Sequence, residues 1–254
     1  MFCDHHGSSS KRKNPYFVRS FRPKKTTVRV FLEEIPTRLR PTITHFTTDT
    51  WEGYLNAIDE FIAAHDDVSA SPVVDRFHVA QHYRNDFDNL RKQELKRLKK
   101  ELPKETYDKD CKGMLWTLRK NHASLDIDER RSLRRLFRHA PALHQAYTFR
   151  EELTAIFNQE LSIAEAELRL LVWVQKVERS DLDTFDGFIK TLRNHWQYII
   201  NYFEQRISSG FVEGLNNKIR TIKRRCYGIR KVSTLFQRIW LDLHGPDRFS
   251  LSTT

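Results

Sequence analysis

Residues 42–78, "TITHFTTDTWEGYLNAIDEFIAAHDDVSASPVVDRFH", decide the fold of this chain. They begin with a β-branched run that predicts a short strand ending at Asp49. Apolar residues at helical spacing follow from Trp51, and "SPVVD" then predicts a second short strand ending at Asp75. Another helix is predicted from Phe77. Because strands and helices alternate, we predict parallel strands in an α/β sheet.

The segment before these strands divides into a polar leader and a helix. Residues 1–25 include "HHGSSSKRKNP", which is basic, turn-forming and without periodicity, so we predict a flexible leader. In the following "TTVRVFLEEIPTRL", apolar residues recur at helical spacing. We expect Thr26 or Thr27 to cap this helix and Pro36 to disturb its end.

Helical periodicity dominates the rest of the chain. Residues 84–206 contain no convincing strand, and "LRRLFRHAPALHQAYTFREELTAIF" and "AEAELRLLVWVQKV" are typical of packed helices. Residues 207–254 predict a helix, a turn near Tyr227 and Gly228, and a second helix. We therefore predict an α/β fold that is mostly helical overall. Its partial α/β core at 26–83 is interrupted by an all-helical insertion at 84–206, and the C-terminal helices return to the core.

Composition limits the class of partner. The 254 residues carry a net charge of +11, which favours a polyanion such as DNA, RNA or an anionic membrane. No apolar run is long enough to span a bilayer, and the basic helix lacks the apolar face of a membrane-surface helix, so we expect a cytoplasmic protein with no membrane partner. The three widely spaced cysteines do not suggest a disulfide framework.

Two carboxylates follow the predicted strands. Asp49 and Asp75 lie where strands end, and ligands bind at the carboxyl ends of strands in open α/β sheets. The alternative is that each Asp simply caps the helix after it. His78 lies three residues after Asp75 and suits a polar pair near a site, although a capping Asp beside a surface His gives the same pattern.

A third carboxylate, Glu213, opens the stretch "VEGLNNKIRTIKRRCYGIRK". If its helix packs beside the strand ends, Glu213 and Asp49 share divalent cations, because Mg²⁺ prefers carboxylate oxygens and two such ions assist phosphoryl displacement. The alternative for Glu213 is favourable placement of an acid in the first turn of a helix.

A dense basic run follows Glu213 and has few neighbouring acids. Lys and Arg contacts to phosphates dominate nucleic-acid affinity, so we predict DNA binding here. The adjacent asparagines either bond bases or phosphates or are ordinary polar helix positions. The candidate DNA-binding residues are Asn216, Asn217, Lys218, Arg220, Lys223, Arg224, Arg225, Arg230 and Lys231.

Three blocks in order, "TTDTWEGYLNAI", "VVDRFHVAQHY" and "VEGLNNKIRTIKRRCYGIR", resemble the DDE transposases of bacterial insertion sequences, specifically the ISL-three group. The resemblance implies a ribonuclease-H-like core with a helical insertion, and DNA strand cleavage and transfer that depends on Mg²⁺ or Mn²⁺, with two ions in an intact member. It assigns Asp49 as the second acid and Glu213 as the third, both as metal ligands. Asp75 with His78 matches a supporting D-x-x-H element.

The chain departs from this family pattern at its beginning. The strand that carries the first acid, and the N-terminal zinc-binding and helix-turn-helix regions, have no counterpart here. We therefore expect an N-terminally truncated transposase domain with impaired catalysis that forms homo-oligomers or mixed oligomers with a full-length relative, and a leader that is either native or a frameshift product. The alternative is a non-catalytic DNA-binding remnant that inhibits such a relative. A metal-dependent nuclease on the same core would need a substitute for the missing acid.

Overall fold

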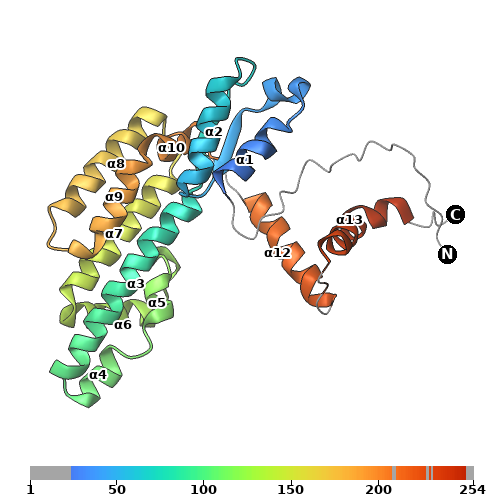
Figure 1. Cartoon of the computed structure of the whole chain (residues 1–254). Helices are drawn as coiled ribbons and strands as arrows, with labels where there is room; N and C mark the ends of the chain where they lie inside the picture. The colour runs from blue at the N-terminus through green and yellow to red at the C-terminus, as the bar shows by residue number, and fades with distance from the viewer. Residues whose placement is uncertain (1–23, 208–209, 227–228, 230, 250–254) are drawn as a thin grey trace, which may run out of the picture. The chain divides into compact units, whose positions relative to one another are not determined.

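The computed structural model describes residues 24–207, 210–226, 229 and 231–249 (Figure 1). All but the last two residues of the predicted leader lie outside this part of the chain. The fold divides into two compact units, Met1–Ile207 and Ser208–Thr254. Each unit is described by itself.

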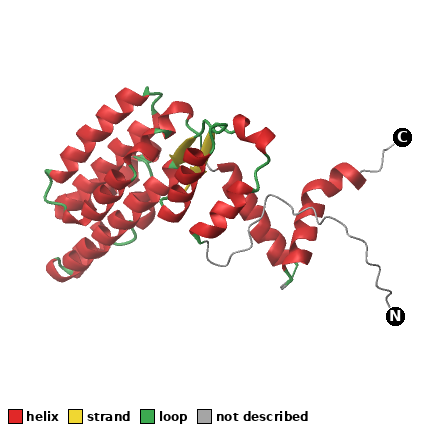
Figure 2. Ribbon diagram, turned by 45° about the horizontal axis from the view of Figure 1, so that its top comes forward, coloured by secondary structure: helices red, strands yellow, loops and turns green. Residues whose placement is uncertain are grey.

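A small parallel sheet forms the α/β part of the first unit (Figure 2). Strand β1 (His45–Thr48) pairs in parallel with β2 (Ser71–Val74), with Thr48 opposite Val74. Helix α2 (Glu52–Ala64) connects them. Val73 and Val74 are fully buried, as expected for a strand covered by helices. The predicted strand–helix alternation and the parallel pairing are confirmed.

Helix α1 (Lys25–Glu33) packs on α2, and Leu32 contributes to an apolar cluster with Ala57, Ile58 and Phe61. The predicted cap is wrong: the helix begins at Lys25, and Lys24, its N-cap, makes no side-chain capping bond. Packing against α2 therefore fixes this helix without a capping hydroxyl. A 3₁₀ helix, Thr37–Thr42, follows Pro36 and was not predicted.

The described remainder of the first unit contains helices and no strand, as predicted. Helices α3 (Arg76–Glu101), α7 (Pro141–Asn158), α8 (Ile163–Glu178) and α9 (Asp186–Asn194) run beside one another (Figure 1). Pro141 begins α7, so the periodic stretch around Ala140 forms two helices. Capping boxes begin α6 (Ile127–His139) and α8. The elements are α3 (Arg76–Glu101), α4 (Lys104–Asp110), α5 (Leu115–Arg119), η2 (His122–Ser124), α6 (Ile127–His139), α7 (Pro141–Asn158), α8 (Ile163–Glu178), η3 (Asp183–Phe185), α9 (Asp186–Asn194), α10 (Trp196–Ile200) and α11 (Tyr202–Gln205).

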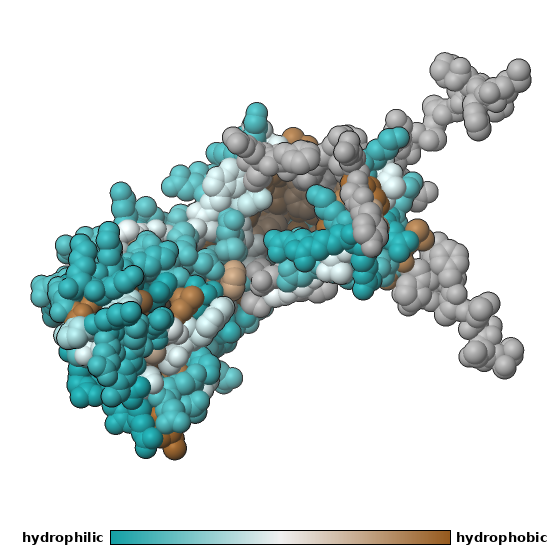
Figure 3. Space-filling model, turned by 90° about the horizontal axis from the view of Figure 1, so that it is seen from below, coloured by the Kyte–Doolittle hydropathy of each residue, from teal (hydrophilic) through white to brown (hydrophobic). Residues whose placement is uncertain are grey.

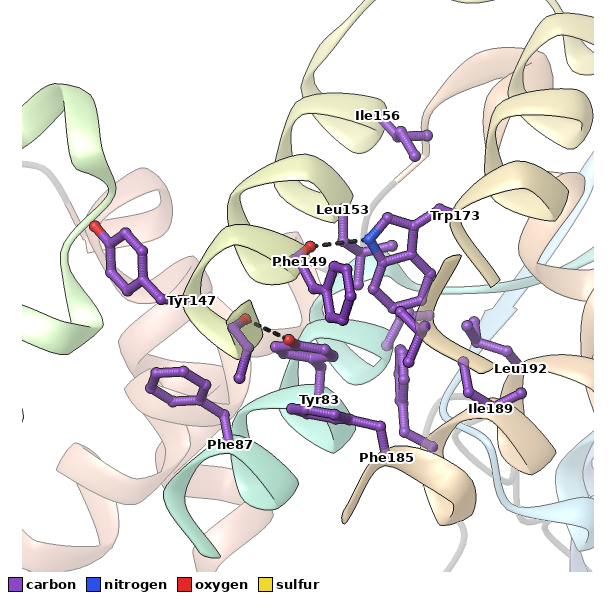
Figure 4. Close-up of a cluster of buried hydrophobic side chains, with 14 of the residues drawn as sticks. Tyr83, Phe87, Tyr147, Phe149, Leu153, Ile156, Trp173, Phe185, Ile189 and Leu192 are labelled. Carbon is purple, nitrogen blue, oxygen red and sulfur yellow. Dashed lines mark hydrogen bonds between the residues drawn. The ribbon is translucent and has the colours of Figure 1, made fainter. Parts of the chain in front are cut away.

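An aromatic cluster fills the space between these helices (Figure 4). The ring of Tyr83 stacks on Phe185 at 4.6 Å, and its hydroxyl donates a 2.6 Å hydrogen bond to the carbonyl of Ala146. The indole Nε1 of Trp173 donates to the carbonyl of Phe149 at 2.9 Å. Each buried polar atom of the two side chains therefore has a partner, which removes the cost of burying it.

Helix α3 and two side-chain hydrogen bonds join the sheet to the helical part of the first unit. Helix α3 runs unbroken across the predicted boundary between residues 83 and 84. On the return, the Asn201 side-chain amide donates to the carbonyl of Pro72 at 2.9 Å, and the Tyr198 hydroxyl donates to Asp59 at 2.5 Å. These bonds tie the end of the helical part to β2 and α2.

The surface of the helical part is largely hydrophilic, in keeping with the high content of charged residues. The helical part of the first unit presents mostly hydrophilic side chains in Figure 3, with isolated hydrophobic ones among them. Within the described residues, no helix combines the length and the hydrophobicity needed to cross a membrane.

The second unit contains α12 (Gly210–Arg225) and α13 (Val232–Phe249). Ile222 and Ile239 are buried, and Lys218 forms a 3.2 Å ion pair with Asp242. The two helices predicted for this region are confirmed. The predicted turn at Tyr227 and Gly228 lies outside the described residues.

Candidate functional site

The carboxyl ends of β1 and β2 bring two predicted site residues to one edge of the sheet. The backbone amide of Asp75 donates a 3.2 Å hydrogen bond to the carbonyl of Thr48. Asp49 follows Thr48 directly, so both acids leave neighbouring parallel strands at the same end. This is the edge at which open α/β sheets bind ligands.

Asp75 is only 2% exposed and is the N-cap of α3. Its Oδ1 accepts a 2.9 Å hydrogen bond from the amide of Phe77. The capping interpretation therefore holds for Asp75, and a carboxylate suits this position because the helix begins with unpaired N–H groups and a partial positive charge.

Asp49 has a different local role. The N-cap of α2 is Trp51, so Asp49 does not cap that helix. Its Oδ1 accepts a 2.9 Å bond from the Trp51 amide in a local turn, and Oδ2 has no hydrogen-bond donor among the described residues. The side chain is half-buried, and its negative charge adds to burial in raising the pKa of Tyr54. Asp49 thus keeps one carboxylate oxygen available for a ligand.

Two histidines of α3 lie near this edge of the sheet. Only one of them, His78, is among the site residues predicted from the sequence. The half-buried His78 contacts the ring of Phe77 edge-on at 5.6 Å. His82, one turn further along α3, places Nε2 2.9 Å from the hydroxyl of Thr50, next to Asp49. His82 lies seven residues after Asp75, which puts both on one face of α3, so helical spacing was the signal that could have found it.

His195 also belongs to this region, since its imidazole lies near Glu52 and His82. It is only 8% exposed, and burial lowers the pKa of its imidazole. No local pattern around His195 indicates this placement, because it depends on the return of the chain from the helical part to the sheet.

The strand-end carboxylates have the right chemistry for a divalent cation, because Mg²⁺ and Mn²⁺ take oxygen ligands. Among the described residues, however, no three His, Cys, Asp or Glu side chains are grouped so that they could hold a metal ion. Asp49, whose Oδ2 has no hydrogen-bond donor in the described structure, has the chemistry of a single carboxylate ligand.

Glu213 lies in the first turn of α12, as the sequence predicts, but its side chain is outside the described part of the chain. The basic run that follows forms the rest of this helix. Among the side chains of α12 that the structure describes, Ile222 is buried, and the lysines and arginines are exposed. The basic side chains of α12 are therefore accessible to a binding partner.

The predicted DNA-binding residues of α12 divide into two groups. Lys218 pairs with Asp242, and Asn217 accepts a 3.1 Å bond from Arg220. The exposed side chains of Lys223, Arg224 and Arg225 make no hydrogen bond or ion pair with any described residue. Asn216 and Lys231 are also exposed, and Arg230 lies outside the described residues. The end of α12 therefore presents three cations that no described acid compensates.

Comparison with known proteins decides the family. The model of the ISL3-type DDE family, described as "Transposase", matches residues 6–239, which is most of the chain. The chain belongs to the ISL3 family of DDE transposases. Enzymes of the DDE transposase family act on DNA and use a divalent metal ion.

Two curated relatives of this ISL3 chain are longer proteins. It is 28% identical over 214 residues to the "Transposase for insertion sequence element IS1001" of Bordetella parapertussis, a match that covers 84% of this chain and 50% of the relative. It is 26% identical over 134 residues to the "Transposase for insertion sequence element IS1557" of Mycobacterium tuberculosis, covering 53% of this chain and 30% of that relative. The chain thus spans about half the length of the curated relatives or less. No solved structure shows significant similarity.

Proposed function

We propose that this chain is part of the catalytic domain of a DNA transposase, with a partial ribonuclease-H-like core. The observation that carries the proposal is the pair of acids, Asp49 and Asp75, at the carboxyl ends of two hydrogen-bonded parallel strands. The match to ISL3 transposases supports DNA transposition as the process.

In this proposal Asp49 and Glu213 are the catalytic carboxylates, and both ligate Mg²⁺ or Mn²⁺. The ion, when bound, stabilises charge on the oxygens of the reacting phosphate and lowers the pKa of a bound water. Asp49 suits a ligand because its Oδ2 is not engaged within the described structure. Asp75 supports the site by fixing the start of α3, and His78 is adjacent to it. Glu213 belongs to the second unit, and its assignment rests on the family resemblance.

The DNA backbone is held by α12 in this proposal. Lys223, Arg224 and Arg225 are exposed and have no acidic partner among the described residues, so they are well suited to phosphate oxygens. Arg220, Asn216 and Asn217 lie earlier on the helix and add polar contacts, whereas Lys218 is engaged by Asp242. Arg230 and Lys231 complete the predicted set.

Catalysis by these 254 residues alone is expected to be weak, because the resemblance accounts for two of the three acids of a DDE site. The second candidate function, a non-catalytic DNA-binding protein that interacts with a longer relative, is favoured by the exposed cations of α12, which can hold phosphates without a metal ion. The two candidates share DNA binding and differ in metal-dependent strand cleavage.

The test is a nicking and strand-transfer assay on insertion-element ends with Mg²⁺ or Mn²⁺, beside a DNA-binding measurement. We expect salt-dependent DNA binding and little strand transfer. Robust transfer that Glu213→Gln abolishes would support the carboxylate assignment and contradict the expected impairment. Transfer that survives both Asp49→Asn and Glu213→Gln would overturn the assignment of the site.

A further inference from the structure

A cavity of about 340 Å³ lies between α3 and α7, within the first unit. Its size falls in the range of pockets that bind small molecules. The lining contains four arginines and no aspartate or glutamate: Arg76, Arg84, Arg119 and Arg150. A concave site with this composition attracts an anion, because its low-dielectric walls concentrate the positive field.

Two of these arginines are already engaged. The Arg119 guanidinium donates to Asp88 at 2.7 Å. Arg150 donates to the carbonyls of Leu118 and Lys120 and to the carboxylate of Glu151, and it lies 4.4 Å from the ring centre of Tyr147. These bonds hold the wall of the cavity, so its net positive charge comes from the other two arginines.

Arg76 and Arg84 have no acidic partner in the described structure. Arg76 donates only to the neutral side chain of Asn158, at 3.2 Å. Arg84 is exposed and makes no hydrogen bond or ion pair with a described residue. Guanidinium groups bind phosphate with two parallel hydrogen bonds, so two uncompensated arginines at one cavity favour a phosphate.

An exposed aromatic ring lies on the same face of α3. Phe77 lines the cavity and is 41% exposed, which is unusual for so large an apolar side chain. Phe77 and Arg84 are seven residues apart, hence on one side of the helix and about 11 Å apart along it. Ala80 lies between them on that face and also lines the cavity, so its small side chain leaves space between ring and guanidinium.

We propose that this cavity binds a single unpaired nucleotide, with its phosphate on Arg76 and Arg84 and its base stacked on Phe77. Arginine for phosphate and an aromatic face for a base are the two contacts by which proteins hold unpaired nucleic acid. A cavity of this size admits one nucleotide and excludes a duplex. The inference rests on the proposed function, since DNA is the source of the nucleotide and Arg76 directly follows Asp75 at the strand ends.

The test compares two DNA duplexes of equal length, one fully paired and one with a single extrahelical nucleotide, in binding to the whole chain. We expect the chain to bind the second about tenfold more tightly, because stacking of one base on an aromatic side chain has that size of effect. Phe77→Ala and Arg84→Glu should bring the ratio of the two affinities close to one. An abasic residue at the unpaired position should remove the preference in the unsubstituted chain.

Arg179→Glu is the matched control, because Arg179 is an exposed arginine at the end of α8 and does not line the cavity. It makes the same change of charge as Arg84→Glu and should leave the ratio unchanged. Equal binding of both duplexes, or a preference that survives both cavity variants, would overturn the inference while leaving the proposed function intact. Failure to bind either duplex would overturn both. A free mononucleotide that binds as tightly as the unpaired position would assign the cavity to free nucleotides and contradict the DNA assignment.

Discussion

The amide of Asp75 donates its hydrogen bond to the carbonyl of Thr48, the residue before Asp49. This one bond sets two acids at the same edge of the sheet, yet their carboxylates do different things. The Asp75 carboxylate is buried and caps α3, whereas Asp49 keeps an oxygen without a donor in the described structure. The two acids should therefore respond differently to substitution.

Asp75→Ala should lower the free energy of unfolding by about 1–2 kcal/mol, because it removes the N-cap of a long helix. Urea unfolding of the whole chain measures this. Asp75→Asn keeps a capping oxygen and should cost clearly less. If Asn and Ala at this position cost the same, the capping bond to Phe77 is not what the carboxylate contributes.

Asp49→Asn should leave the free energy of unfolding nearly unchanged, because the amide oxygen still accepts the bond from Trp51. It should weaken Mn²⁺ binding, followed by electron paramagnetic resonance, since an amide is a poorer ligand than a carboxylate. Asp66→Asn is the control, an exposed acid in the turn after α2. Equal loss of Mn²⁺ binding in both variants would show that the ion is held by general surface charge.

Charge reversal at Arg224 and Arg225 should weaken DNA binding and flatten its dependence on salt. Each phosphate contact that is lost lowers the slope of log affinity against log salt by about one. Binding titrations at several salt concentrations give that slope. Lys218→Glu changes a cation of the same helix that is paired with Asp242, so it should affect the slope less. If the three substitutions changed the slope equally, the expectation that the paired Lys218 contributes less to phosphate binding would be contradicted.

The buried His195 should make stability depend on pH. Burial lowers the pKa of its imidazole in the folded chain, so the unfolded chain takes up the proton first as pH falls. The contribution to stability is complete above the unfolded pKa of about 6.5 and is lost as pH falls through the folded value. His195→Gln should reduce the loss of stability between neutral pH and pH 5, measured by urea unfolding. His122→Gln, at an exposed site, should not.

The hydrogen bond of the Tyr83 hydroxyl should contribute measurably to the stability of the aromatic cluster. Tyr83→Phe removes the bond to the carbonyl of Ala146, which keeps its hydrogen bond within α7, so it should cost about 0.5–1.5 kcal/mol. Thermal or urea unfolding measures the loss. Tyr107→Phe is the control, since Tyr107 is a partly buried residue whose hydroxyl makes no bond in the described structure. A similar cost at both positions would show that the loss does not come from the hydrogen bond to Ala146.

The sequence predicted those parts of the fold that depend on local pattern. The β-branched run before Asp49 and the apolar run before Asp75 indicate two strands, and their alternation with helices correctly indicates parallel pairing. The start of α1 was predicted wrongly because tertiary packing on α2 outweighs the preference of a threonine for the N-cap. The position of Pro141 could have indicated the break before α7.

The candidate site was predictable to a smaller extent. Spacing after the strands placed Asp49 and Asp75 at strand ends, but it left open which of them caps a helix. The answer depends on the residue at which each helix begins: α3 begins directly after Asp75, whereas α2 begins three residues after Asp49. His195 joins the region only through the return of the chain by α10. The cavity arginines are spread from Arg76 to Arg150, and no window of sequence brings them together.

The unbroken course of α3 has a consequence for anyone who redesigns this protein. Its first turn is fixed to the sheet edge by Asp75, and its later turns supply Tyr83 and Phe87 to the aromatic cluster. Excising the helical part to obtain a minimal domain would cut through this one helix and uncover the apolar side chains it buries. A successful deletion would need new polar residues along α3, or a short replacement helix to cover it.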